Sequence, residues 1–205
     1  MTGTKSPRER YREQMRAEIK ERAWAQIAEA GAASLSLNAI AKQVGMSGPA
    51  LYRYFAGRDE LITELIRDAY RDLADAVRSA FEGGADVAGL ARTVRAWALA
   101  DPQRYFLIYG TPVPGYHAPA DTTAISNEIM TVLLAAHSAL PARPATPFET
   151  HLAGYTPAAT SAAALHRALT FWTRVHGVLS LELAGHFTGM GFDPAQLFDD
   201  EVARL

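Results

Sequence analysis

A short run of small, aromatic and basic side chains, at residues 47–54, has the residue types that suit contacts with nucleic acid. Tyr52 and Tyr54 flank Arg53, and four small residues come just before them: Ser47, Gly48, Pro49 and Ala50. Tyrosine hydroxyls and a guanidinium can bond to phosphate oxygens, and tyrosine rings can stack on sugars. Such a small, basic surface also fits the major groove. The chemistry that this run indicates is recognition of double-stranded DNA.

Two short helices joined by a tight turn would present these side chains. Ser36 can cap the first helix, because its side-chain oxygen can accept from free backbone N–H groups. Four apolar residues then recur at helical spacing: Leu37, Ile40, Ala41 and Val44. Gly45 can take a positive φ at the turn, and Pro49 falls in the first turn of the second helix, where it needs no N–H. With Leu51 and Phe55 facing the core, the pattern predicts a helix–turn–helix.

The rest of the chain also follows helical periodicity. We predict further helices over residues 11–30, 59–81, 86–100, 101–109, 121–140, 161–186 and 194–205. Residues 1–10 are predicted to be a flexible arm, either a solvated tail or a phosphate contact. Residues 141–160 are rich in Pro, Ala and Thr, and no element is predicted there. The helix over 161–186 is apolar nearly all round, which indicates burial against its own core and a partner subunit.

Charge is distributed unevenly along the 205 residues. The net charge is −2, but residues 1–60 hold ten Lys or Arg and seven Asp or Glu, a net of +3. The remaining residues hold ten and fifteen, a net of −5. A cationic first segment on an acidic body suits a DNA-reading head on a body that binds ligand or dimerises. The absence of cysteine, of a signal peptide and of any apolar run near 18 residues indicates a cytoplasmic protein without a membrane span.

Catalytic and metal-binding patterns are missing from the sequence. His166, His176 and His186 recur every ten residues, which does not place them on one helix face. No His-Glu-x-x-His, Gly-x-Ser-x-Gly or paired-carboxylate motif occurs. We therefore expect no catalytic residue, no metal and no cofactor.

The body carries a set of large side chains that could line an apolar pocket. Taken singly, such side chains are more often plain core, and His176 could be a buried histidine or a hydrogen-bonding group of the pocket. As a group, beside proline-rich loops, they suit a small, largely apolar effector. The predicted ligand-binding residues are Trp97, Tyr105, Phe106, Tyr109, Met130, Leu133, Phe171, Trp172 and His176.

The run from Gly45 to Phe55, followed by Gly57-Arg-Asp-Glu-Leu-Ile62, resembles the signature of the TetR family of bacterial transcriptional regulators. The resemblance covers the first quarter to third of the chain. A shorter stretch, Trp172 to Gly177, resembles the Trp…His-Gly element of one TetR subgroup.

The resemblance implies an all-α protein with a DNA-binding domain over residues 1–58 and a ligand-binding and dimerisation domain over 59–205. It also implies a homodimer that binds operator DNA and is released by a small molecule in the body. The residues to which it assigns DNA contact are Ser36, Leu37, Asn38, Ser47, Gly48, Pro49, Ala50, Tyr52, Arg53, Tyr54 and Arg58. Two other classes remain open: a module whose head docks protein, and a small helical enzyme with an incidental helix–turn–helix.

Overall fold

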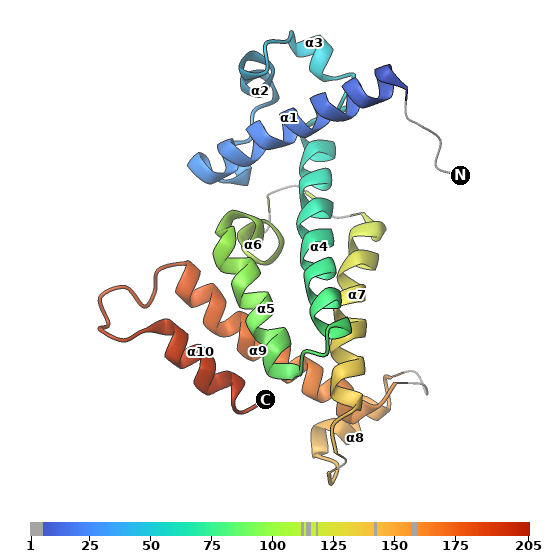
Figure 1. Cartoon of the computed structure of the whole chain (residues 1–205), viewed down its shortest axis with the longest axis vertical. Helices are drawn as coiled ribbons and strands as arrows, with labels where there is room; N and C mark the ends of the chain where they lie inside the picture. Colours follow the sequence, from blue (N-terminus) through green and yellow to red (C-terminus); the bar gives the residue numbers. More distant parts are fainter. Residues whose placement is uncertain (1–5, 112, 114–115, 118, 142, 157–159) are drawn as a thin grey trace. The chain divides into compact units, whose positions relative to one another are not determined.

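The computed structural model describes residues 6–111, 113, 116–117, 119–141, 143–156 and 160–205. Every regular element among these residues is a helix, which confirms the predicted all-α class (Figure 1). The chain divides into two compact units. The first comprises Met1–Ala69 and Gln103–Thr122, and the second comprises Tyr70–Pro102 and Thr123–Leu205. The domain boundary after residue 58 stays a prediction.

Helix α1 (Pro7–Ala30) begins earlier than the sequence predicted. Ser6 accepts from the backbone of Glu9, and the Glu9 carboxylate accepts from the backbone of Ser6. This capping box, with proline in the first turn, starts the helix within the segment that was predicted to be a flexible arm. The prediction was therefore wrong for residues 7–10, while residues 1–5 lie outside the described residues.

Helices α2 (Leu37–Gln43) and α3 (Gly48–Leu51) form the predicted helix–turn–helix. The turn between them uses Gly45 at φ 71°, as its place in the sequence predicted. A short 3₁₀ helix, η1 (Ala32–Ser34), links α1 to α2 and was not predicted. The head core is fully buried, and its members come from all three α-helices and the segment after them: Ile19, Ala23, Ile27, Ile40, Leu51 and Phe55.

Two further helices contribute to the first unit. The first half of α4 (Arg58–Glu82) belongs to it, and residues from Tyr70 onward belong to the second unit. Helix α6 (Pro102–Tyr109) matches its predicted range. Lys20 of α1 and Asp68 of α4 form an ion pair at 2.6 Å.

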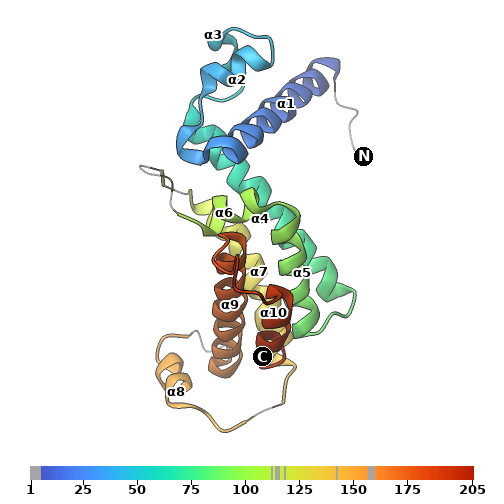
Figure 2. The same ribbon diagram turned by 90° about the vertical axis from the view of Figure 1, so that its left-hand side faces the viewer.

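The second unit is built around α9 (Ala162–Leu183). It packs against α5 (Val87–Ala100), α8 (Pro147–Ala153) and α10 (Pro194–Val202), and Figure 2 shows α9 and α10 side by side. Arg95 of α5 and Glu182 of α9 form an ion pair at 2.6 Å, with both side chains mostly buried. The Arg95 guanidinium also lies 5.3 Å from the ring centre of Phe198, so this one side chain ties three helices together.

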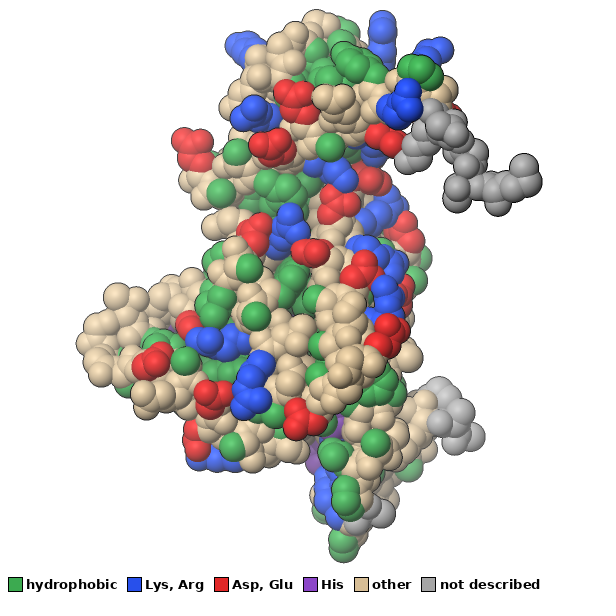
Figure 3. All heavy atoms as spheres, viewed as in Figure 1, with side chains coloured by type: hydrophobic (Ala, Val, Ile, Leu, Met, Phe, Trp, Pro, Cys, Tyr) green, Lys and Arg blue, Asp and Glu red, His purple; other side chains and the backbone are tan. Residues whose placement is uncertain are grey.

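Helix α7 (Ala120–Ser138) also lies largely in the second unit and agrees with its prediction within two residues at each end. Glu128 of α7 accepts from Arg71 at 2.8 Å and from Arg78 at 3.4 Å, both on α4. Figure 3 shows acidic and basic side chains interleaved over this part of the surface. These charges therefore pair between two helices rather than forming a patch of one sign.

Helix α8 lies in the segment for which the sequence predicted no element. Thr146 accepts from the backbone of Glu149, whose carboxylate accepts from the backbone of Thr146 at 2.8 Å. Glu149 is buried, and it also bonds to Arg143 and His166. The bond from the Thr146 backbone, helped by His166 and Arg143, holds the pKa of the Glu149 carboxyl below its usual range. The Thr-Pro-x-Glu sequence was the signal that could have predicted this helix.

Gly45 gives a direct test of the turn. A Cβ at this position would meet no atom within 4 Å, so the only penalty of Gly45→Ala is the positive φ. We expect a loss of about 1 kcal/mol in the free energy of unfolding. Gly57→Ala is the matched control, because Gly57 has equally open space and no positive φ. Denaturant unfolding of both variants is the measurement, and equal stability of the two would contradict the role given to the turn.

Candidate nucleic-acid interface

The outward surface of α3 and the turn after it carries the predicted DNA-contacting side chains. Pro49, Tyr52 and Arg53 are exposed, and Ala50 and Tyr54 are half-buried. Tyr52 is exposed over 52% of its area, so its ring and hydroxyl are accessible to a partner. Leu51, in the same turn, is fully buried. Helix α3 and the turn after it thus have one side in the core, at Leu51, and an outer side that is polar, aromatic and basic.

The start of α2 supplies the second part of the surface. The Ser36 side chain accepts from the Ala39 backbone at 3.4 Å and so acts as the helix cap that was predicted. Asn38 is exposed beside α3, and a Cβ on Gly48 would lie 3.3 Å from its side-chain oxygen. Gly48 therefore leaves room for the Asn38 amide between the two helices. Leu37 is 8% exposed and packs in the core, so its side chain has little surface to offer DNA.

A groove beside α3 brings in Tyr11 and Arg12, which the sequence reasoning missed, and Arg8, for which a phosphate contact was one of two alternatives. It has a volume of about 320 Å³ and lies between α1 and α3, with Arg8, Tyr11 and Arg12 on one wall and Arg53 and Tyr54 on the other. Arg8 and Arg12 are one helical turn apart, and Tyr11 is 60% exposed. Basic side chains project from this head in Figure 3. The i, i+4 pair of arginines beside an exposed tyrosine was the available signal, once α1 was known to include them.

Two arginines that face the head brace its backbone. Arg16 donates to the Tyr54 carbonyl, its guanidinium lies 4.1 Å from the ring centre of Phe55, and it pairs with Glu64 at 3.3 Å. Arg58 donates to the carbonyl oxygens of Ala32 and Ala33 in η1, at 2.9 and 3.1 Å.

The structure therefore gives Arg58 a bracing role in the head. Both bonds come from its Nη2 group, so they do not exclude the DNA contact that the resemblance implies, which stays a prediction.

The predicted effector-binding residues fall in both units. Tyr105, Phe106 and Tyr109 belong to the first unit, where Tyr105 is 1% exposed and the other two rings contact it at 5.7 and 5.4 Å. Burial raises the pKa of the Tyr105 hydroxyl to about 12. The remaining six belong to the second unit: Trp97, Met130, Leu133, Phe171, Trp172 and His176.

Within the second unit, the predicted effector-binding residues divide into core and half-buried positions. Leu133 and Phe171 are fully buried, which is the plain-core alternative. Trp172 and His176 are half-buried and their ring centres lie 4.3 Å apart on α9. Burial lowers the pKa of the His176 imidazole to about 4, so it is neutral at pH 7. Trp97 donates its indole N–H to Asp72 at 3.2 Å.

In the part of the chain that the structure describes, no group of three or more His, Cys, Asp or Glu side chains could hold a metal ion. No helix among the described residues is long and apolar enough to cross a membrane. The head is the part of the structure whose surface has a recognisable chemistry, and a helix–turn–helix with an arginine and tyrosines on its outer face defines a DNA-binding protein.

Comparison with known proteins places the chain among bacterial regulators. Residues 19–65 match the family model described as bacterial regulatory proteins, tetR family, and residues 87–205 match the tetracyclin repressor-like C-terminal domain. The second match covers more than half of the chain. The chain belongs to the TetR family, whose members are transcriptional regulators and not enzymes.

Individual relatives agree with this family. The HTH-type transcriptional regulators Rv1816 of Mycobacterium tuberculosis and Mb1846 of Mycobacterium bovis are each 51% identical over 119 residues. The match spans 55% of this chain and 51% of each relative, so it covers about half the length of these relatives.

Solved structures resemble the whole chain. The crystal structure of the regulatory protein SCO4313 is 63% identical, with a TM-score of 0.91 over 97% of this chain and 98% of that one. A TetR family transcription regulator from Marinobacter aquaeolei is 16% identical, with a TM-score of 0.63 over 96% and 97%, and so shares the fold. The resemblance of Trp172–Gly177 to one subgroup stays a prediction.

Arg53 is expected to carry base recognition, because it has the longest donor on the exposed surface of α3 and the turn after it. Arg53→Ala should weaken binding to the preferred duplex by roughly 1–3 kcal/mol and relax the preferred sequence. Arg12→Ala should instead weaken all duplexes alike and reduce the salt slope by about 1, as expected for loss of one phosphate contact. Titration at several salt concentrations, against preferred and scrambled duplexes, separates the two effects. An Arg53→Ala protein with unchanged affinity and preference would show that α3 is not the reading element.

The lowered pKa of His176 predicts how the free energy of unfolding depends on pH. The folded protein lowers its pKa from 6.5 to about 4, so folding favours the neutral ring and the unfolded chain takes up a proton first as the pH falls. The stability that depends on neutral His176 is present above the unfolded pKa of 6.5 and is lost as the pH falls toward 4. His176→Gln should flatten the fall in unfolding free energy between these values. Denaturant unfolding at half-unit pH steps measures it, and parallel curves for the two proteins would contradict a buried neutral imidazole.

Proposed function

We propose that this transcriptional regulator is a homodimeric repressor that a small, largely apolar molecule releases from its operator. The observation that carries the DNA-binding part is the head surface, where Tyr52 and Arg53 are exposed in the turn after α3, beside the Arg8 and Arg12 groove. Two such heads about 34 Å apart would enter successive major grooves on one side of a duplex. The operator would then contain two inverted half-sites.

The outward side of α9 supports the homodimer. Four residues at intervals of four form one stripe without charge: Leu169, Thr173, Gly177 and Leu181. The last three of these are exposed. Gly177 has no atom within 4 Å of an added Cβ, so a second helix could approach its backbone closely. We propose this stripe and α10 as the dimer interface.

The charges of α9 point the same way. Arg167 donates to the Pro141 carbonyl at 2.7 Å, and Arg174 donates to the Arg204 carbonyl at 3.2 Å. Glu182 pairs with Arg95. All three charged residues of this helix thus bind groups of their own chain, and the outer stripe is left uncharged. A solvated helix face normally carries charge, so this pattern favours a covered face.

Small-molecule control is the third part of the proposal. Half-buried Trp172 and neutral His176 on α9 offer an aromatic face and a hydrogen-bonding ring, which suit an apolar ligand with one polar group. Binding there would lower operator affinity by the difference in ligand affinity between the DNA-bound and free conformations.

Gly177→Leu tests the dimer. Leucine has a higher helix propensity than glycine and meets open space within the protomer, so the protomer should stay folded. In a dimer packed on this stripe the larger side chain would collide with the partner. Sedimentation at micromolar concentration should give about 44 kDa for the wild type, twice the 22.2 kDa chain, and 22.2 kDa for the variant.

A matched DNA assay completes the dimer test. Duplexes selected from a random pool by the wild type should contain inverted half-sites, and Gly177→Leu should bind them weakly. Ser79→Leu, on the exposed surface of α4, is the control for an added leucine. A Gly177→Leu protein that still sediments as a dimer would place the interface elsewhere, and a wild type that selects no sequence at any salt concentration would favour a head that docks protein.

Trp172→Ala tests the effector site. Compounds that release the wild type from the selected duplex should release the variant only at higher concentration, while its affinity for the duplex without compound stays near that of the wild type. A melting curve checks that the variant is folded. If a folded Trp172→Ala responds as the wild type does, the effector binds at another place.

A further inference from the structure

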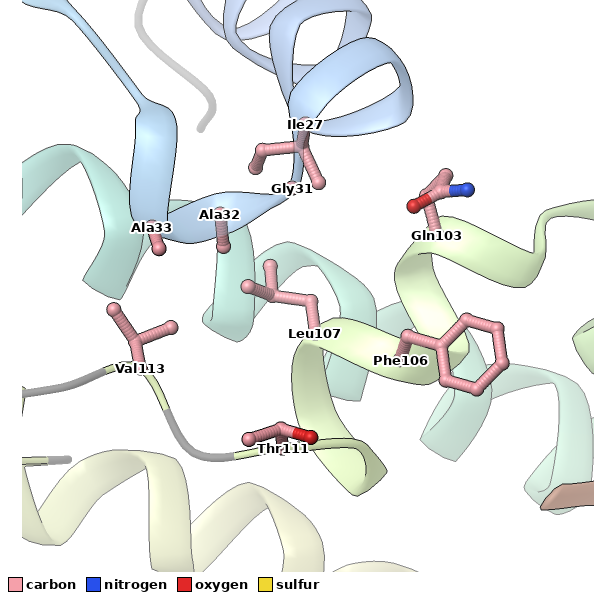
Figure 4. A pocket seen from close by; sticks show the side chains of 9 residues that line it. All are labelled: Ile27, Gly31, Ala32, Ala33, Gln103, Phe106, Leu107, Thr111 and Val113. Atoms are coloured by element: carbon pink, nitrogen blue, oxygen red, sulfur yellow. The ribbon is translucent and has the colours of Figure 1, made fainter. Parts of the chain in front are cut away.

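A cavity in the first unit lies outside the residues proposed for either DNA or the body effector, apart from Phe106. It has a volume of about 400 Å³ and is bounded by the end of α1, by η1, and by α6 with the segment after it (Figure 4). This volume falls within the roughly 300–1,000 Å³ of small-molecule sites. The cavity therefore has the size of a binding site for a compact organic molecule.

The lining defines the chemistry of an occupant. Ile27 enters from α1, Leu107 points from α6 toward Ala32 of η1, and Val113 points toward Ala33 (Figure 4). These walls are aliphatic. The polar side chains among the lining residues are the Gln103 amide and the Thr111 hydroxyl, both uncharged. A neutral, largely apolar molecule with one or two hydrogen-bonding groups matches this lining.

The wall formed by η1 is directly continuous with the DNA-reading surface. Arg58 holds the carbonyl oxygens of Ala32 and Ala33, two residues of that wall. Three residues after Ala33, the Ser36 backbone donates to the Gln26 side chain at 3.0 Å, and the Ser36 hydroxyl caps α2. An occupant that contacts η1 therefore contacts the short segment that sets the start of α2.

We propose that this cavity is a second regulatory site, which takes a small neutral apolar molecule and couples its binding to the reading helices through η1. The proposal rests on the proposed DNA-binding function, but the site is separate from the Trp172 and His176 region of the second unit. An occupant that binds this conformation of η1 better than others would hold η1 against α6 and slow local opening of the head.

The test uses 1-naphthol as the probe, a neutral bicyclic molecule with one hydroxyl group. Calorimetric titration should show binding to the full-length wild type. Ala33→Phe adds a ring at an exposed wall residue whose Cβ points toward the cavity, and it should weaken binding by about tenfold or more as the space fills (Figure 4). Ala28→Phe, on the exposed face of α1, is the matched control and should bind as the wild type does.

A second filling variant protects the test against a local change in η1. Thr111→Trp blocks the cavity from the opposite wall and should lose binding as well. Ser79→Leu, on the exposed surface of α4 in the second unit, should keep it. Unchanged binding in both filling variants would overturn the proposed site.

Hydrogen exchange and DNA binding test the coupling. With the probe bound, amide exchange should slow over residues 31–36 and 103–111 in the wild type and not in Ala33→Phe. The affinity for the selected duplex should also change by about threefold or more with the probe, in the wild type only. Binding without these changes would overturn the coupling. The proposed DNA-binding function is tested separately, by the duplex affinity of the wild type without probe.

Discussion

The head depends on one constraint: α3 is a single turn of helix and cannot hold its shape alone. Isolated helices of that length are unstable in water, because nucleation fixes several dihedrals for one hydrogen bond. Burial of Leu51 within it and of Phe55 after it supplies the missing stability. Arg16 adds to this by covering the Phe55 ring and donating to the Tyr54 carbonyl. Helix α1 therefore positions the reading surface. Substitution of Arg16 on α1 would alter the backbone position of Tyr54 even without DNA.

The same short helix explains how closely the reading elements approach each other. Asn38 of α2 lies next to Gly48, and any larger residue there would press on its side-chain oxygen. Because Gly48 has no side chain, there is room for the Asn38 amide beside the start of α3. Ser36 is the N-cap of α2, so it fixes the start of the helix that carries Asn38. Among the exposed polar side chains near the start of α2, Asn38 is the one whose placement suits a base edge.

Much of this arrangement could be predicted from the sequence, because local rules govern it. The structure confirms the positive φ of Gly45, the capping by Ser36 and the apolar spacing of α2, each of which follows from neighbouring residues. The bracing role of Arg58 was not predicted, because its partners are the carbonyl oxygens of η1, an element that the sequence pattern did not predict. The spacing of apolar residues does not indicate which backbone carbonyl oxygens will need a side-chain donor.

Other differences have the same origin. Leu37 satisfied two patterns at once, helical core and family DNA contact; its burial confirms the first, and the second stays a prediction. Helix α8 was missed because its seven residues are too few for periodicity, although its capping box was in the sequence. The groove on α1 escaped because Arg8 belonged to a segment taken as unstructured. Sequence spacing could not predict the partners of residues that interact between different helices, because it reports only on neighbours along one helix.

The small size of the reading surface makes the dimer a physical requirement of the proposed function. One head offers a single-turn helix, one long donor at Arg53 and a phosphate groove, which is little area for a specific interface. In a dimer, once one head has bound its half-site, the second head binds the other half-site intramolecularly. The high effective concentration of the second head then compensates for the weak affinity of each head alone. That gain exists only if the two heads match the groove spacing, and it vanishes if they do not. A ligand therefore need not touch the reading side chains to release the protein; a change in the spacing or mobility of the heads removes the gain and leaves two weak sites.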